Sequence, residues 1–226
     1  SAASDVYKRQ DLIQRLINKC GYQKYLEIGL GKNCDNFKRI NAETKIGIDP
    51  YRPDNINDLL NETVLYYEMA SEVFLDEHQD VLNGVDIVFI DGLHEYGQVY
   101  KECISVMQHL KVGGSVLIHD CNPFTKEMAI PLSKLPEYDR LREPWMGDVW
   151  KTIVLLRKLY PTWNIYVADT DCGIGIIKKT SNSIEPVSLS QDLLQEMNNL
   201  QYEDLEKDRV AMLNLKSIEQ LLEKEI

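Results

Sequence analysis

The sequence lacks several features that mark particular classes of protein. No apolar run approaches the roughly 18 residues of a membrane-spanning helix, and no segment resembles a secretory signal. Basic residues are scarce: 25 lysines and arginines stand against 36 acidic residues, for a net charge of −11. Proteins that bind nucleic acid through its phosphates present a basic surface, so we expect no nucleic-acid partner. The missing apolar run leads us to expect no membrane partner either. A small-molecule ligand fits this composition better.

Paired cysteines are also missing. The cysteine count of 5 is odd, and no two cysteines form a CxxC pair. This argues against a disulfide framework and against a zinc site, and it predicts a reducing compartment, the cytoplasm. We expect most of these cysteines to be small buried side chains.

The chain divides into three parts by composition. Residues 1–10 (SAASDVYKRQ) resemble a translated adapter remnant, so we expect them to carry no fold information. Residues 11–180 are expected to form a single α/β domain, because the chain is long enough for one full core. Residues 181–226 are expected to form a polar linker followed by acidic helices.

Apolar runs alternate with segments of helical period, which predicts βαβ units and a parallel sheet. Residues 85–90 (VDIVFI) are the clearest strand, and residues 96–107 place their apolar side chains on one helical face. The last two strands are expected to form a hairpin. The fold class is therefore α/β: a Rossmann-like, seven-stranded, mostly parallel sheet flanked by helices, with one antiparallel strand and additional C-terminal helices. The expected strands span residues 24–28, 45–48, 63–68, 85–90, 115–118, 164–168 and 173–178.

Two connecting segments have distinct expectations. Residues 36–40 are expected to form a helix after the first strand. Residues 123–147 contain three internal prolines and no sustained period, which is typical of a lid or substrate loop.

A glycine turn follows the first expected strand in the sequence YLEIGLG. Glu27 ends the strand, and Gly29 and Gly31 allow the backbone to approach a ligand closely. Asp49 lies at the end of the second strand, where a carboxylate can accept both ribose hydroxyls of an adenosine. The alternatives are a solvated strand end for Glu27 and a simple turn residue for Asp49.

The same geometry serves nicotinamide dinucleotides, but two details oppose them. Cys34 occupies the place of the third glycine in a dinucleotide fingerprint. The carboxylate of Glu27 would repel a pyrophosphate, whereas it suits a cofactor with an amino-acid tail.

These residues resemble the class I S-adenosylmethionine-dependent methyltransferases. The resemblance rests on E-x-G-x-G from Glu27, GIDP ending at Pro50, MASEVFL from Met69 and DIVFIDGLHEY from Asp86. It implies S-adenosylmethionine as the cofactor. The implied contacts are Glu27, Gly29 and Gly31 with the methionine end, Asp49 with the ribose, Met69, Ala70 and Ser71 with the adenine, and Asp91 at the border of the site.

Acidic residues follow the fourth and fifth strands, in the sequences DGLH (residues 91–94) and HDCN (residues 119–122). Asp91 and Asp120 should converge, and two converging carboxylates are costly unless a cation or a proton lies between them. The layout is similar to that of magnesium-dependent small-molecule O-methyltransferases, which implies Asp91, Asp120 and Asn122 as ligands. The match is partial, because Cys121, a poor magnesium ligand, occupies the usual place of the amide.

Histidines accompany both acidic residues. His94 occupies the position of a general base in those enzymes, and together with Asp91 and Asp120 it completes the predicted catalytic set. Alternatively, His94 caps the following helix, and His119 is a satisfied strand-end histidine. The surrounding motifs resemble a subfamily found beside glycan and secondary-metabolite genes, which implies a hydroxyl of a small molecule or sugar as the methyl acceptor.

Three functions remain open from the sequence. The first is the methyltransferase acting on oxygen, the second is an NAD-type Rossmann oxidoreductase, and the third is a non-catalytic adenosine-binding module. The sequence does not decide the acceptor, the need for a metal, the role of the C-terminal helices or whether the chain forms a homo-oligomer.

Overall fold

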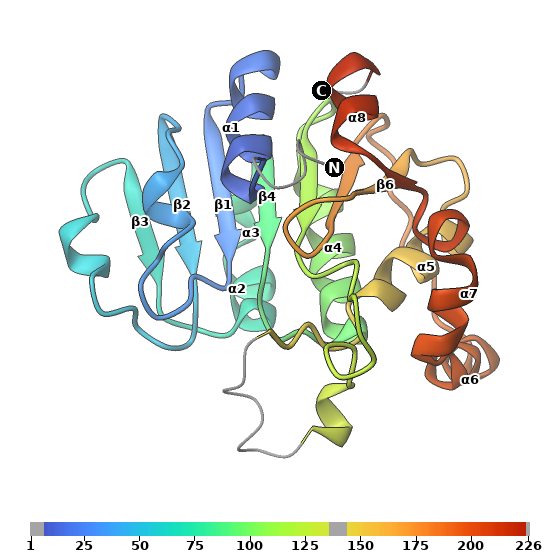
Figure 1. Cartoon of the computed structure of the whole chain (residues 1–226). Coiled ribbons are helices and arrows are strands. Elements are labelled where there is room, and N and C mark those ends of the chain that lie inside the picture. The colour runs from blue at the N-terminus through green and yellow to red at the C-terminus, as the bar shows by residue number, and fades with distance from the viewer. Residues whose placement is uncertain (1–6, 136–143, 225–226) are drawn as a thin grey trace.

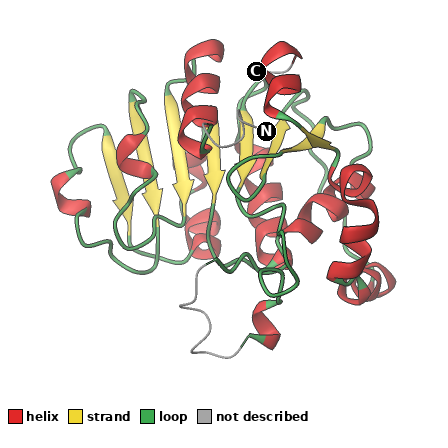
Figure 2. Ribbon diagram, in the orientation of Figure 1, coloured by secondary structure: helices red, strands yellow, loops and turns green. Residues whose placement is uncertain are grey.

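A sheet of eight strands forms the centre of the computed structural model, which describes residues 7–135 and 144–224 (Figure 1). The strand order is β3-β2-β1-β4-β5-β7-β6-β8. Figure 2 shows the strands side by side, with helices on both faces. The strands are β1 (Lys24–Ile28), β2 (Thr44–Ile48), β3 (Val64–Tyr67), β4 (Ile87–Ile90), β5 (Ser115–Ile118), β6 (Ile165–Ala168), β7 (Ile174–Lys178) and β8 (Leu215–Lys216).

The predicted α/β class and its single antiparallel strand are confirmed. Strands β1 to β5 pair in parallel with their neighbours, whereas β7 runs antiparallel to both β5 and β6. The expected number of seven strands is too low, because β8 pairs in parallel with β6. A strand of two residues inside a segment of helical composition leaves no alternating pattern by which the sequence could reveal it.

Helices cover both faces of the sheet. Figure 1 shows α1 and α8 on one face, with α4 and α5 on the other. The helices are α1 (Arg9–Cys20), α2 (Ser71–Glu77), α3 (Gln79–Leu82), α4 (Tyr96–His109), α5 (Trp150–Leu159), α6 (Gln191–Asn199), α7 (Tyr202–Leu213) and α8 (Ile218–Lys224), with short 3-10 turns η1 (Phe37–Arg39), η2 (Ile56–Asp58) and η3 (Leu132–Lys134).

The apolar core has two parts because successive side chains of a strand point to opposite faces. In β4, Val88 and Ile90 join the cluster under α4 and α5, whereas Ile87 and Phe89 join the cluster under α1 and α8. The predicted apolar face of α4 is buried against the first cluster. A central strand covered on both sides is held rigidly, and so is the point at which it ends.

Three segments differ from the expectations. Residues 36–40 form only the single 3-10 turn η1, whose Phe37 is buried in the core. Arg9 and Gln10 already belong to α1, although whether residues 1–10 are native stays a prediction. Of the expected loop at residues 123–147, residues 136–143 lie outside the described part of the chain; the rest contains η3.

The C-terminal segment packs on the same sheet. In addition to the β8 pairing, Arg157 of α5 donates hydrogen bonds to backbone carbonyls of α7, one of them to Met212 at 2.8 Å. The boundary at residue 180 and a homo-oligomer stay predictions. Within residues 7–135 and 144–224, no helix has the length and apolar character to cross a membrane.

Candidate active site

A cavity of about 780 Å³ opens at the edge of the sheet where β1, β2, β4 and β5 end. Parallel strands that neighbour each other end at the same edge, so the residues that follow them meet there. The polar residues that line the cavity from these four strand ends are Glu27, Asp49, Asp91, His94, His119 and Asp120.

The glycine turn after β1 lies against the end of β4. Gly29 has a φ of +85°, and a Cβ atom placed on it would lie 2.1 Å from the backbone oxygen of Asp91. Gly31 also has a positive φ, of +65°, but a Cβ atom there would meet no atom within 4 Å. Gly29 is therefore required for the contact between the two strand ends, whereas Gly31 is required only for its backbone conformation.

Glu27 is a buried carboxyl and not a solvated strand end, because its side chain is only 1% exposed. The hydroxyl of Tyr25 donates to its Oε2 at 2.5 Å, and Nδ2 of Asn36 donates to the same atom at 2.9 Å. Burial outweighs these hydrogen bonds and raises the pKa of Glu27 to about 8.

Asp49 joins the end of β2 to the glycine turn. Its Oδ2 accepts hydrogen bonds from the backbone N–H of Leu30 at 2.8 Å and of Gly31 at 3.3 Å, and its Oδ1 accepts one from Tyr51 at 2.8 Å. Asp49 and both glycines line the same cavity, as their predicted shared role requires.

Of the three residues expected beside an adenine, two line the cavity. Ala70 and Ser71, which lead into α2, form part of its wall. Met69 packs against the apolar core and is not among the lining residues. The segment after β3 is thus at the cavity, but Met69 lies behind it.

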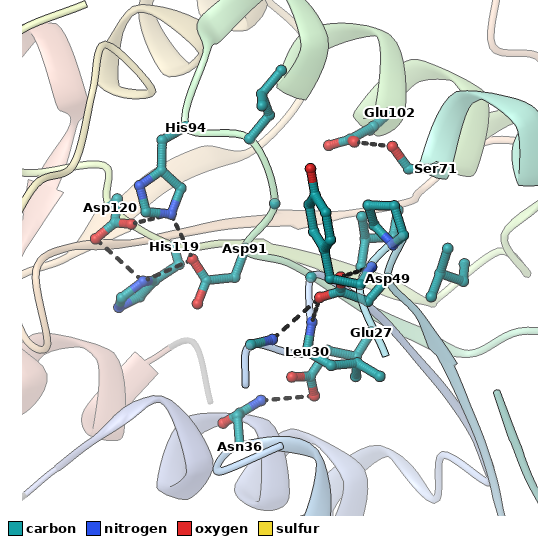
Figure 3. Close-up of a pocket in the computed structure, with 18 of the residues that line it drawn as sticks. Glu27, Leu30, Asn36, Asp49, Ser71, Asp91, His94, Glu102, His119 and Asp120 are labelled. Carbon is teal, nitrogen blue, oxygen red and sulfur yellow. Dashed lines mark hydrogen bonds and ion pairs between the residues drawn. The ribbon is translucent and has the colours of Figure 1, made fainter. Parts of the chain in front are cut away.

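Asp91 and Asp120 converge on two imidazoles, as Figure 3 shows. Nε2 of His94 lies 3.2 Å from Oδ1 of Asp91 and 3.1 Å from Oδ2 of Asp120. Nδ1 of His119 lies 3.3 Å from Oδ1 of Asp91 and 3.2 Å from Oδ1 of Asp120. The four side chains therefore form one cluster of alternating charge.

The cluster compensates its own buried charge. Burial alone would raise the pKa of Asp91, but the charge of His119 and hydrogen bonds from His119 and His94 hold it well below its usual value. Burial would lower the pKa of His119, yet Asp91, Asp120 and Asp171 together raise it well above its usual value. His119 is therefore a resident cation between carboxylates, and not only a satisfied strand-end histidine.

His94 does not cap the following helix. Glu95 is the N-cap of α4, and its side chain accepts hydrogen bonds from the backbone N–H of Gly97 and Gln98. His94 instead has a φ of +58° and turns its ring into the cluster, with Nδ1 3.1 Å from the backbone oxygen of Trp145. Because a carbonyl only accepts, Nδ1 carries a proton and Nε2 is the basic atom.

The pKa of His94 is raised as well. Burial lowers it, but the hydrogen bond to Asp91 and the charges of Asp120 and Asp91 outweigh burial. Protonated His94 balances the negative charge of Asp91 and Asp120. It can therefore act as a base towards another molecule only when a different cation balances that charge.

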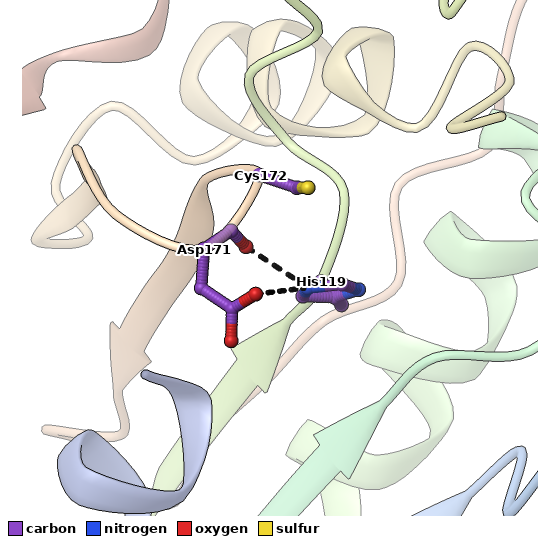
Figure 4. Close-up of side chains that lie close together, drawn as sticks. All are labelled: His119, Asp171 and Cys172. Atoms are coloured by element: carbon purple, nitrogen blue, oxygen red, sulfur yellow. Dashed lines mark hydrogen bonds and ion pairs between the residues drawn. The ribbon is translucent and has the colours of Figure 1, made fainter. Parts of the chain in front are cut away.

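A second group of side chains that could hold a metal ion consists of His119, Asp171 and Cys172 (Figure 4). Nε2 of His119 lies 2.9 Å from the backbone oxygen of Asp171 and 3.7 Å from its carboxylate, with Cys172 beside them. Arg9 donates to Asp171 at 2.9 Å and to Asp91 at 3.1 Å. These contacts fix the ring of His119 against the turn between β6 and β7.

Asn122, the third predicted magnesium ligand, is not among the residues that line the cavity, and its amide has other partners. Its Oδ1 accepts a hydrogen bond from Arg209 of α7 at 2.6 Å, and its Nδ2 donates to Asp169 at 3.2 Å. Both polar atoms of the amide are thus engaged outside the pair of Asp91 and Asp120, and its part in a metal site stays a prediction. Among the described residues, the groups that bring ligand atoms within 4.8 Å of one another are Asp91, His94 and Asp120, and separately His119, Asp171 and Cys172.

Sequence reasoning missed several residues of the site. Asn36 and Asp171 lie outside the motifs quoted from the sequence. Arg9 lies within residues 1–10, which were expected to carry no fold information. Glu102 precedes the buried Cys103 in α4. In the sequence it is only one charged residue beside the apolar face of a helix, so no motif indicated a role for it. It lines the cavity and is 1% exposed.

Known proteins share this architecture. Residues 26–121 match the family model of a methyltransferase domain. A search of curated protein sequences finds no match. Among solved structures, the MycE methyltransferase from the mycinamycin biosynthetic pathway, in complex with Mg, SAH and mycinamycin VI, aligns at 14% identity and a TM-score of 0.52. The alignment covers 79% of this chain and 51% of that one, so the chain spans about half the length of MycE.

The alignments with two further solved structures span more of those proteins. A protein of Staphylococcus aureus, provisionally named a caffeoyl-CoA O-methyltransferase, aligns at 19% identity with a TM-score of 0.54, over 76% of this chain and 84% of that one. A protein of Klebsiella pneumoniae, provisionally named an O-methyltransferase, aligns at 9% identity with a TM-score of 0.53, over 76% and 80%. At these identities the likeness concerns the fold.

Fold and matched domain agree with the class that the strand-end motifs resemble, the class I methyltransferases. Residues 26–121 match a methyltransferase domain, and the sheet has the fold of the solved methyltransferases described above. The resemblance of the strand-end motifs to this family is thereby confirmed.

The glycine turn provides a first prediction. Gly31→Ala strains only a positive φ and should lower the free energy of unfolding by about 1 kcal/mol. Gly29→Ala also forces the ends of β1 and β4 apart and should cost about 3 kcal/mol. Urea unfolding of both variants measures the difference; equal losses would mean that the contact between Gly29 and Asp91 does not constrain the site.

Proposed function

We propose that the protein transfers a methyl group from S-adenosylmethionine to a hydroxyl of a small molecule or sugar, with His94 as the general base. The observation that carries this proposal is the single cavity that Gly29 and Asp49 share with His94. One end of the cavity has the groups that suit a nucleoside with an amino-acid tail, and the other has a base between two acidic residues.

In this proposal, the donor occupies the end of the cavity that contains the glycine turn and Asp49. Asp49 accepts the ribose hydroxyls, while the glycine turn and Glu27 hold the methionine end. Ala70 and Ser71 border the adenine. A sulfonium supplies an electrophilic methyl group, so the remaining task of the chain is to align an acceptor and remove its proton.

The acceptor is expected next to His94. Trp145 lines this part of the cavity, with its ring centroid 5.2 Å from that of His94, and Leu93 adds apolar surface. Nε2 of His94 takes the proton of the acceptor hydroxyl, while Nδ1–H stays bonded to the carbonyl of Trp145. A hydroxyl is a poor nucleophile until its proton leaves, which is why the base is needed.

The donor set of Asp91 and Asp120 fits a magnesium ion, because carboxylate oxygens are its preferred ligands. When bound, a divalent cation lowers the pKa of an acceptor hydroxyl. A cation there would also compensate both carboxylates and leave Nε2 of His94 free to act as a base. His119 already supplies part of that compensation, and a bound cation would supply the rest.

Cellular location and partners are part of the same proposal. All 5 cysteines of the sequence are free in the structure, as a reducing compartment such as the cytoplasm requires. The net charge of −11 supports a small-molecule acceptor and opposes nucleic acid.

Calorimetry with S-adenosylmethionine, S-adenosylhomocysteine and NAD tests the proposed donor. We expect the first two to bind and NAD not to bind, since Cys34 occupies the place of the third glycine of a dinucleotide fingerprint. Asp49→Asn should weaken S-adenosylhomocysteine about 30-fold by removing charged hydrogen bonds, whereas Asp58→Asn, at an exposed position of η2, should not. Binding of NAD alone would establish the oxidoreductase alternative instead.

Glu27 predicts a pH dependence of donor binding. Its pKa of about 8 means that the free protein holds this carboxyl largely protonated at pH 7. A cationic methionine end favours the ionised form, so binding should release a proton and strengthen as the pH rises from about 6 to 8. Calorimetry at pH 7 in phosphate and in Tris measures the released proton, because the buffer takes it up and the observed binding enthalpy then differs between the two buffers. Glu27→Gln should abolish the difference between buffers; its persistence in that variant would assign the proton to another group.

Activity tests the base and the metal once a screen of hydroxylated sugars and phenols supplies an acceptor. We expect EDTA to stop turnover and magnesium to restore it. His94→Gln should lower kcat about 1000-fold without changing the affinity for S-adenosylhomocysteine, and His109→Gln, at the end of α4, serves as the control. Full turnover in chelator would exclude the metal, and an unchanged kcat in His94→Gln would exclude the base.

A further inference from the structure

The cavity wall opposite the acidic cluster contains a carboxyl that the proposed methyl transfer does not use. Glu102 of α4 is 1% exposed and lines the cavity. Its Oε1 accepts hydrogen bonds from the hydroxyl of Ser71 and from Nε2 of Gln98, the latter at 3.3 Å. Its Oε2 is buried and has no hydrogen-bond partner in the described part of the chain. Figure 3 shows Glu102 and Ser71 together at the cavity.

An unpaired buried carboxylate oxygen is costly, and a merely structural role does not explain it. Burial raises the pKa of Glu102, with a further rise from the nearby charges of Glu72 and Glu95. Holding Ser71 at the start of α2 requires only Oε1, and the side-chain oxygen of a glutamine could accept the same bonds. In the ionised carboxyl, Oε2 is therefore an acceptor that lacks a donor at the wall of a ligand cavity, and a donor supplied by a ligand would offset the burial that raises the pKa of Glu102.

The position of Glu102 indicates which part of a ligand would reach it. Strands β2 and β3 are parallel neighbours, so Asp49 at the end of β2 and Ser71 after the end of β3 lie at the same edge of the sheet. Tyr51, two residues after Asp49, lines the cavity as well and offers an aromatic surface to a ring. A nucleoside with its ribose at Asp49 would then direct the polar edge of its base towards Ser71 and Glu102.

We propose that Glu102 determines base specificity, with Oε2 accepting a hydrogen bond from the exocyclic amine of the adenine ring. This inference rests on the proposed function, because it takes an adenosine bound at Asp49 as given. A base with a carbonyl in place of the amine would present an acceptor to an acceptor, and Glu102 would repel it. The site thus selects a 6-amino purine against a 6-oxo purine.

The isosteric substitution Glu102→Gln should reverse the polarity of this contact. Ser71 and Gln98 both donate to the position of Oε1, so they should hold the amide oxygen there. The amide NH2 then occupies the position of Oε2 and points a donor at the ligand. This variant should lose affinity for the adenine compound and gain affinity for the hypoxanthine compound.

The experiment compares S-adenosylhomocysteine with S-inosylhomocysteine, its deaminated analogue, by calorimetry. The unmodified protein should bind the adenine compound about 100-fold more tightly, as expected when a buried hydrogen-bonding group would otherwise be left unpaired. In Glu102→Gln the ratio should fall below about 5. Glu77→Gln, the same substitution at an exposed position of α2, should keep the ratio of the unmodified protein.

Three outcomes would contradict the proposal, and they are distinguishable. If both affinities change together in Glu102→Gln and the ratio stays constant, Glu102 only holds α2 in place. If the unmodified protein binds both compounds equally, the site does not read the amine, a result that does not depend on the folding of any variant. If the unmodified protein does not bind S-adenosylhomocysteine at all, the proposed function itself fails.

Discussion

The convergence of Asp91 and Asp120 is the constraint on which the rest of the site depends. These two carboxylates, at the ends of adjacent parallel strands, bring oxygen atoms within 4.8 Å of each other, and their repulsion has to be offset. His94 and His119 offset it in the structure, each lying within 3.3 Å of both carboxylates. The basic atom of His94 is therefore fixed at the cavity, where the proposed acceptor would meet it, and the same acidic pair would hold a divalent cation if the proposed metal binds.

The contact between Gly29 and the backbone of Asp91 couples this cluster to the binding end of the cavity. Because no side chain intervenes, the end of β1 and the end of β4 lie directly against each other. Asp49 extends the arrangement to β2 by accepting the backbone N–H groups of the glycine turn. A donor held by this turn would thus have its reactive end directed towards Asp91 and His94, which is the requirement for an in-line transfer.

The sequence predicted those parts of the protein in which local pattern and tertiary structure agree. Strand β5 at Ser115–Ile118 and the amphipathic helix α4 are where the periodicity places them, because burial on both faces of β5 and on one face of α4 produces the pattern. Strand β8 and the single turn η1 escaped prediction because both are too short to show a period. The strand ends were predictable as a group, since parallel strands bring them to one edge.

Side-chain direction was the part that the sequence could not supply. Asn122 follows Asp120 by two residues, yet its amide oxygen accepts a hydrogen bond from Arg209 of a distant helix, and Asn122 does not line the cavity. Met69 is adjacent to two lining residues but faces the core. Glu102 reaches the cavity from within a helix rather than from a strand end, so no strand-end motif includes it. Each of these depends on contacts between segments far apart in the chain.

The central claim is that one cavity holds the donor with its methionine end at the glycine turn and its reactive end facing His94. A crystal structure of the complex with S-adenosylhomocysteine tests this claim most directly. The account predicts the ribose at Asp49, the homocysteine beside Glu27 and Gly29, and the sulfur on the side of His94. A ligand whose ribose lies away from Asp49, or whose sulfur faces away from His94, would contradict it.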